Sequence, residues 1–365
     1  MDVAQERRAY LTLDGMRGVG AVVVVMRHVP YLFGPIRVPE SFLAVDLFYL
    51  VSGFVVAHAY GERLKRGGFF WAFVKTRLIR LYPLYLLGLA VGLIPAIYSL
   101  ANDPHSWWLP HKLSEAILLG LFMIPMMPGI QASGTALDGP VWTLVPELIA
   151  NYVYAAIVKW LNLGVLAAIL IVCGAGLVYG EHRFHTLDIG YNPTDQWAAL
   201  ARVGYSFFAG VVVFRFFGAQ KIDNQWASWA CVVALAVLIS LSPSQAMIPW
   251  FEPLLVMVGF PLLLIAAARF EPGPFVGRMF SVIGLVSYAV YLLHQPMGNI
   301  ARILLGKIHV HVPGDARALI FGAAFMAIVM AFSWWLDSHY DAPVRKVLRG
   351  WFLDKPKPAK AAAAG

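Results

Sequence analysis

The chain has 365 residues, of which 60% are hydrophobic and only 13% are charged. Soluble domains carry roughly a quarter of charged residues, so this composition excludes a soluble globular protein and predicts an all-α, polytopic membrane protein. The net charge of +8 does not indicate nucleic-acid binding here, because the basic residues gather at the ends of apolar segments as topology signals. The two cysteines, Cys173 and Cys231, lie in apolar runs, which argues against a disulfide framework or a metal site.

Apolar segments long enough to approach the thickness of a membrane recur along the whole chain. A helix needs about 20 mostly apolar residues to cross the hydrocarbon core. The candidates are 13–33, 42–60, 81–100, 113–128, 141–160, 162–180, 198–217, 227–241, 250–268, 282–300 and 316–336. No small-residue cleavage site follows the first segment, so we expect it to be retained as a span and not removed as a signal peptide.

The distribution of basic residues reduces these eleven candidates to ten spans. The loop 61–80 and the tail after residue 344 are both rich in Lys and Arg. Positive loops stay cytoplasmic, so both termini are expected inside and the number of crossings must be even. Segment 113–128 is short and ends in "IPMMPG", so it is expected to be re-entrant or to lie on the surface; the alternative is that 141–160 fails to cross.

We therefore expect one transmembrane domain over residues 1–350, with about ten helices, in the inner membrane of a bacterium. The Pro- and Ala-rich residues 351–365 are expected to form a disordered cytoplasmic tail.

The first span contains Asp14, Arg17, Arg27 and His28 within an otherwise apolar stretch. Arg17 and His28 are eleven residues apart, which is about three helical turns or roughly 16 Å on one helix face. Asp14 lies one turn before Arg17 on the same side. Ionisable groups inside a membrane are costly and usually face a cavity or a partner. The alternative is structural: an Asp14–Arg17 pair at the interface and a hydrogen-bonded His28 at the helix end.

Two further groups of polar residues follow from the expected sidedness of the spans. Asp46, Glu147 and His294 are expected in the outer half of the membrane with His28, where carboxylates and imidazoles suit general acid–base chemistry. Arg77 and Arg80 lie one turn apart and are expected at the inner surface with Asp14 and Arg17. Adjacent guanidinium groups can bind phosphate bidentately, although contact with anionic lipids or a topology signal would also explain them.

Six stretches of the chain resemble one known family in order and spacing. They are "LDGMRGVGAVVVVMRH", "AVDLFYLVSGFVV", "RLIRLYPLY", "VWTLVPELIANYVY", "SYAVYLLHQP" and "DAPVRK". Together they cover roughly residues 10–350 and resemble the acyltransferase-3 family of integral membrane O-acyltransferases. The resemblance implies ten spans, a cytoplasmic acyl-CoA donor, with acetyl-CoA the common case, and a hydroxyl acceptor on a glycan or another molecule handled at the membrane.

The resemblance also implies roles for individual residues. His28 is expected to act as the general base, with Glu147 or Asp46 orienting it, and no metal is implied. The residues that match the family's motifs are Arg17, His28, Arg77, Arg80 and Glu147, together with Asp14, Asp46, Ser52 and His294. The chain departs from the pattern at Thr143, which replaces the usual Ser, at Arg27 beside His28, and at Pro146, which is expected to disturb the helix before Glu147.

Two other functions compete with this interpretation. A glycan transporter or flippase would also bury charges near the membrane midplane, although it would more often contain paired broken helices in two halves. A catalytically inactive interaction protein is the second alternative. The sequence contains no glycine-rich phosphate loop. The acceptor, the acyl chain length, the oligomeric state and the formation of an acyl-enzyme remain open at this point.

Overall fold

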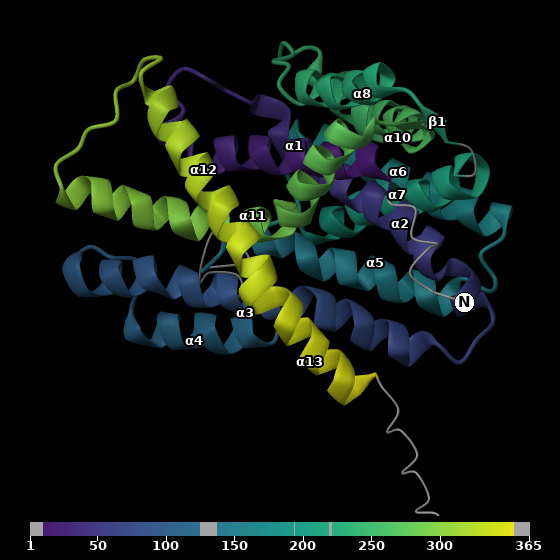
Figure 1. Cartoon of the computed structure of the whole chain (residues 1–365), viewed down its shortest axis with the longest axis horizontal. Helices are drawn as coiled ribbons and strands as arrows, with labels where there is room; N and C mark the ends of the chain where they lie inside the picture. The colour runs from purple at the N-terminus through teal and green to yellow at the C-terminus, as the bar shows by residue number, and fades with distance from the viewer. Residues whose placement is uncertain (1–9, 125–136, 193, 219–220, 354–365) are drawn as a thin grey trace, which may run out of the picture.

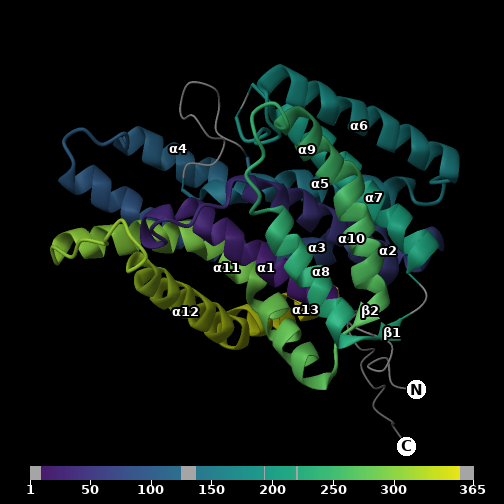
Figure 2. The same ribbon diagram turned by 90° about the horizontal axis from the view of Figure 1, so that it is seen from above.

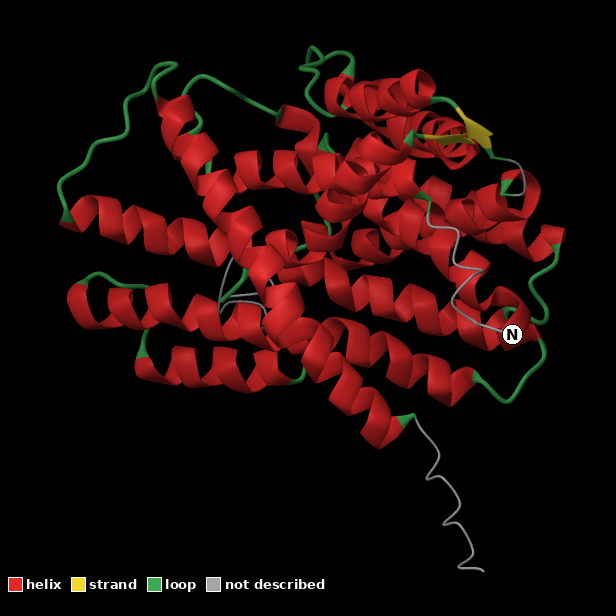
Figure 3. Cartoon of the chain, viewed as in Figure 1, coloured by secondary structure: helices red, strands yellow, loops and turns green. Residues whose placement is uncertain are grey.

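The computed structural model describes residues 10–124, 137–192, 194–218 and 221–353. These residues are almost entirely helical, as Figure 3 shows, which confirms the predicted all-α membrane fold. The one strand pair is short: β1 (Ile222–Asp223) lies parallel to β2 (Phe270–Glu271). Segment 125–128 and most of the predicted tail lie outside the described residues.

The helical elements follow one another along the chain, coloured from purple to yellow in Figure 1. Their bounds are α1 (Leu11–His28), η1 (Pro30–Leu32), η2 (Pro39–Leu43), α2 (Ala44–Lys65), α3 (Phe70–Asn102), α4 (Pro110–Leu121), η3 (Gly139–Thr143), α5 (Leu144–Ile157), α6 (Leu163–Phe184), α7 (Gln196–Phe217), α8 (Gln225–Leu238), α9 (Ile248–Leu254), η4 (Leu255–Gly259), α10 (Phe260–Arg269), α11 (Pro274–Lys307), α12 (Ala318–Leu336), η5 (Asp337–Asp341) and α13 (Ala342–Phe352).

Seven helical runs of the described chain are long and apolar enough to cross a membrane. They are 39–65, 70–102, 163–184, 196–217, 248–269, 274–307 and 318–352. Three other expected spans are shorter or more charged: α1 carries three charged residues, and α5 and α8 have 14 residues each. The count of ten therefore stays a prediction. Helix α4, with 12 residues, is about 18 Å long, which is short against a hydrocarbon core of about 30 Å.

Helices α1 and α11 form the pair that carries the candidate site. They run parallel and lie side by side (Figure 2), with Leu11 facing Gly277 at one end and His28 facing His294 at the other. Glycine permits the close approach: a Cβ on Gly284 would lie 2.4 Å from the Cβ of Asp14. This direction agrees with the sidedness argument, in which both segments cross from inside to outside.

The position of α4 can be tested by labelling single cysteines in a Cys173→Ala/Cys231→Ala background. If α4 does not cross, Asn102→Cys before it and Phe122→Cys after it should both react with an impermeant maleimide from outside. Both side chains are exposed. The control Arg66→Cys should react only after permeabilisation. Labelling of Phe122→Cys only after permeabilisation would show that α4 crosses.

Candidate functional site

A pair of histidines lies where the C-terminal end of α1 meets the middle of α11. The Nε2 atom of His294 lies 3.0 Å from the Nδ1 atom of His28. His294 is fully buried, whereas His28 is exposed on one side. The structure thus brings together the two histidines that sequence reasoning placed in the same half of the membrane.

The hydrogen bonds of this pair assign its protons. The Nδ1 atom of His28 lies 3.0 Å from the Val24 carbonyl oxygen, and the Nδ1 atom of His294 lies 3.1 Å from the Val290 carbonyl oxygen. A carbonyl oxygen only accepts, so each Nδ1 carries a proton. In the neutral rings, Nε2 of His294 then accepts from His28, and Nε2 of His28 keeps its lone pair. His28 is therefore held in the tautomer that a general base requires.

A cluster of arginines lies beside α11, nearer the start of α1: Arg17 comes from α1, and Arg77 and Arg80 come from α3. Arg17 donates from Nη1 to Asp14 at 3.2 Å and from Nη2 to Ser287 at 3.2 Å. Arg80 makes no hydrogen bond or ion pair with any residue in the described part of the chain. The expected Asp14–Arg17 pair is thus present, and one guanidinium group beside it has its donors available.

Glu147 lies in this arginine cluster. The prediction that placed Glu147 with the histidines, apart from the arginines, is therefore wrong. Its Oε1 atom accepts hydrogen bonds from Arg77 at 2.9 Å and from Ser52 at 2.8 Å. Arg77 is the eighth residue of α3, about 10 Å from the helix start, so it reaches into the bundle. Glu147 belongs to the first turn of the short helix α5, and the two side chains meet there.

Pro146 does not disturb α5, contrary to expectation. The helix begins at Leu144, so the proline is its third residue. A backbone N–H at this position has no partner within the helix in any case, and the missing donor therefore costs little. Thr143 keeps a hydroxyl at the position of the usual Ser, and it donates to the Pro140 carbonyl oxygen at 3.0 Å.

Asp46 lies in a buried ion pair with Arg202, and it is not among the hydrogen-bond partners of either histidine in the described chain. Both carboxylate oxygens accept from Arg202, at 3.2 Å from Nε and at 2.5 Å from Nη2. The other guanidinium donors bind the carbonyl oxygens of Ile189 and Phe42. Sequence reasoning missed Arg202, although a basic residue inside the apolar segment 198–217 signals a buried acidic partner.

Arg27, the unusual neighbour of His28, also has a structural partner. It forms an ion pair with Asp188 and donates to the Pro39 carbonyl oxygen at 3.1 Å. This pair ties the end of α1 to the loops that follow α1 and α6.

One face of α11 joins the arginine cluster to the histidine pair. Ser287, Tyr291 and His294 are spaced by four and three residues, which places them on one side of the helix. The Tyr291 ring lies 6.1 Å from the His294 ring, and its hydroxyl lies 2.9 Å from Oγ1 of Thr143. A cavity of about 120 Å³ runs along this face and is lined by Arg17, Ser52, Arg77, Arg80, Glu147 and Tyr291 among others.

A second cavity, of about 240 Å³, lies on the other side of the same arginines. Arg17, Arg80 and Tyr288 line both cavities. The second also contacts Asp337, Asp341 and Arg345 at the junction of η5 and α13. The two cavities and the histidine pair therefore lie one after another along α11, with the histidines outside the lining of both cavities.

Comparisons with known proteins show the family to which this chain belongs. A family model described as an acyltransferase domain matches residues 10–337. "Protein 2 in picA locus" of Rhizobium radiobacter is 41% identical over 189 residues, which cover 46% of this chain and 95% of that protein. "Putative membrane-bound transacylase BcsY" of Komagataeibacter xylinus is 26% identical over 366 residues, which cover 93% of this chain and 86% of that protein.

No solved structure matches the chain. Because the family model covers nearly the whole chain and the histidine pair lies on two of the matching stretches, the protein is an integral membrane O-acyltransferase that belongs to the acyltransferase-3 family.

Proposed function

We propose that this enzyme transfers an acyl group, normally acetyl, from cytoplasmic acyl-CoA to a hydroxyl of a glycan or a related acceptor at the membrane. The observation that carries the proposal is the order of groups along α11: an arginine-lined cavity reaches Tyr291, and His294 one turn further on contacts His28, whose Nε2 is free. The arginines offer charge-assisted bonds to the phosphates of CoA. The cavity between them and Tyr291 would take the extended pantetheine arm.

In the proposed reaction His28 is the catalytic base. Its Nε2 atom takes the proton of the acceptor hydroxyl while the hydroxyl oxygen bonds to the thioester carbonyl carbon. The carbon–sulfur bond then breaks, and His28 returns the proton to the CoA sulfur. His294 is a positioning residue, because its Nε2 atom and the Val24 carbonyl oxygen together accept from Nδ1 of His28 and hold the ring in its tautomer and orientation.

In this proposal the carboxylates of Glu147, Asp14 and Asp46 hold arginine side chains and do not contact the catalytic base. Glu147 holds the Arg77 guanidinium in the wall of the donor cavity, and Asp14 does the same for Arg17. Asp46 keeps α2 and α7 in register through Arg202. The proposal therefore gives no carboxylate a direct bond to His28.

The reaction itself is tested with purified protein in proteoliposomes that contain bacterial membrane glycans. Radiolabelled acetyl-CoA added on the cytoplasmic side should lose its label to a glycan fraction, with release of free CoA. Movement of glycan across the bilayer without consumption of acetyl-CoA would favour a flippase and contradict the proposal.

The donor site is tested at Arg80, whose guanidinium is free to bind phosphate. Arg80→Ala should weaken CoA binding about 10- to 100-fold, because a hydrogen bond to a charged group contributes about 1.5–3 kcal/mol. Arg80→Lys should weaken it less but measurably, since lysine loses the bidentate geometry. Calorimetry in detergent measures all three affinities.

The matched control for this experiment is Arg66→Ala, which removes the same charge from an exposed position outside the cavities. It should leave CoA affinity unchanged. Equal affinity in the wild type and both Arg80 variants, or equal losses in Arg66→Ala and Arg80→Ala, would remove Arg80 from the donor site.

A further inference from the structure

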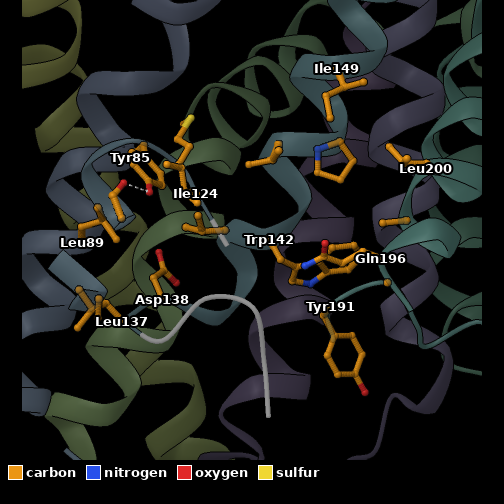
Figure 4. A pocket seen from close by; sticks show the side chains of 18 of the residues that line it. Tyr85, Leu89, Ile124, Leu137, Asp138, Trp142, Ile149, Tyr191, Gln196 and Leu200 are labelled. Carbon is orange, nitrogen blue, oxygen red and sulfur yellow. Dashed lines mark hydrogen bonds between the residues drawn. The ribbon is translucent and has the colours of Figure 1, made fainter. Parts of the chain in front are cut away.

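A further cavity of the membrane domain is separate from the donor site, and no arginine that lines the two donor cavities belongs to its wall. It has a volume of about 390 Å³ and lies between α3 and α4 on one side and η3, α5 and α7 on the other (Figure 4). Ligand pockets usually have volumes of about 300–1,000 Å³. A cavity of this size beside a transferase site has room for a second substrate.

The lining combines aromatic rings with very few polar groups. Tyr85, Trp142, Tyr191 and Trp197 contribute rings, and the rest of the wall is mostly aliphatic. Figure 4 shows Trp142 beside Gln196 and Tyr191. Asp138 lies on the opposite side of the cavity, the side that also holds Tyr85. Such a wall suits a ligand that is apolar over most of its surface and polar along one edge.

Asp138 is the unexplained group in this cavity. Its side chain is 1% exposed, and neither carboxylate oxygen has a hydrogen-bond partner among the described residues. Leaving a buried carboxyl without partners is costly. A carboxyl accepts hydrogen bonds through its oxygens, and in its protonated form it also donates one, so a ligand that satisfies it must bring groups such as hydroxyls, which both donate and accept. A plain acyl chain has none and would leave the group unpaired.

Asp138 also lies close to the segment of α11 that carries His294. A Cβ on Gly88 would lie 3.1 Å from Oδ2 of Asp138 and 3.5 Å from the carbonyl oxygen of Leu292, two residues before the histidine. The next residue, Gly139, faces Gln295, where a Cβ would lie 2.4 Å from Oε1. The Asp138 end of the cavity therefore lies beside the α11 residues on either side of His294.

We propose that this cavity binds the acceptor as a sugar ring attached to an apolar substituent, with Asp138 accepting hydrogen bonds from the ring hydroxyls. The aromatic side chains pack against the C–H faces of the ring and against the apolar substituent. This inference rests on the proposed acyl transfer to a hydroxyl, and it adds the place and the chemical class of the acceptor.

The test uses tritiated octyl β-glucoside below its micelle concentration and the full chain held in amphipol. Scintillation proximity should report saturable binding to the wild type, displaced by unlabelled octyl glucoside and not by the same concentration of octanol. Asp138→Leu should weaken this binding at least tenfold, and Leu200→Trp, which fills the cavity, should abolish it. The control Ile171→Trp adds the same ring on the exposed face of α6 and should bind normally.

Several outcomes would overturn the proposal. These are no saturable binding to the wild type, equal displacement by octanol, or unchanged affinity in Asp138→Leu. If Asp138→Leu fails to fold, Asp138→Asn replaces it; exchanging one carboxyl oxygen for an amide nitrogen should weaken binding at least threefold, and an unchanged affinity contradicts the site. CoA calorimetry on the same variants should give wild-type affinity. Glucoside binding without any CoA binding or acetyl transfer would contradict the proposed reaction and leave this site intact.

Discussion

Replacing His28 by alanine is expected to lower kcat for acyl transfer about 10²–10⁴-fold, the usual contribution of general base catalysis. The reason is local: the free Nε2 of His28 is the proposed proton acceptor, and no other atom of the pair has a free lone pair. CoA affinity should not change, because the arginines are intact. Turnover of labelled acetyl-CoA in proteoliposomes, with CoA calorimetry alongside, measures both effects.

The matched control is His58→Ala on α2. His58 packs against Tyr10 and Phe214 and lines none of the three cavities, so its removal should leave kcat unchanged. Near wild-type turnover in His28→Ala would make His28 a structural residue and would overturn the proposed mechanism.

His294 gives a finer test of the same mechanism. Leucine at this position removes one of the two acceptors that hold the Nδ1 proton of His28, whereas glutamine can place an amide oxygen near the position of Nε2. His294→Gln should therefore retain clearly more kcat than His294→Leu at an equal folded fraction. Equal losses would indicate that His294 only fills space.

Removing the carboxylate of Asp46 is expected to cost about 3–5 kcal/mol of stability, because Asp46→Ala leaves the buried Arg202 guanidinium without its counter-ion. Arg202 is 1% exposed and Asp46 is fully buried. Unfolding in mixed micelles, followed by circular dichroism, measures the loss. The double variant Asp46→Leu/Arg202→Met should recover most of it, since an apolar pair of similar size can replace a buried ion pair.

The double variant also separates stability from chemistry at Asp46. If the ion pair only sets the packing of α2 on α7, the apolar pair should restore a large part of the transferase activity together with the stability. A variant that is stable but still inactive would indicate that Asp46 acts directly in the reaction.

Features that depend on short segments could be predicted from the sequence. The apolar composition indicates helices, because a segment in lipid must satisfy its own backbone hydrogen bonds. The helical period places Arg17 and His28 on one face of α1, and it places Tyr291 and His294 on one face of α11. The charge bias gave α1 and the 282–300 segment the same direction, and the structure shows them parallel.

The ionic partners could not be predicted in this way, because they depend on how far each helix is shifted along its neighbours. A shift of one turn is about 5.4 Å, enough to exchange one partner for another. Sidedness reasoning placed Glu147 near the histidines, whereas the start of α5 beside the eighth residue of α3 pairs it with Arg77.

The sequence by itself determined the helical membrane fold, the family and the two polar faces of α1 and α11, because each follows from composition, period or motif order. The tertiary structure alone decided that Arg202 binds Asp46 and that Asp138 faces a cavity without a partner. These facts depend on interhelical register. Close contacts set that register, such as Gly284 against Asp14 and Gly53 against the backbone of Phe207, where packing energy selects one position among many that the hydrophobic pattern allows.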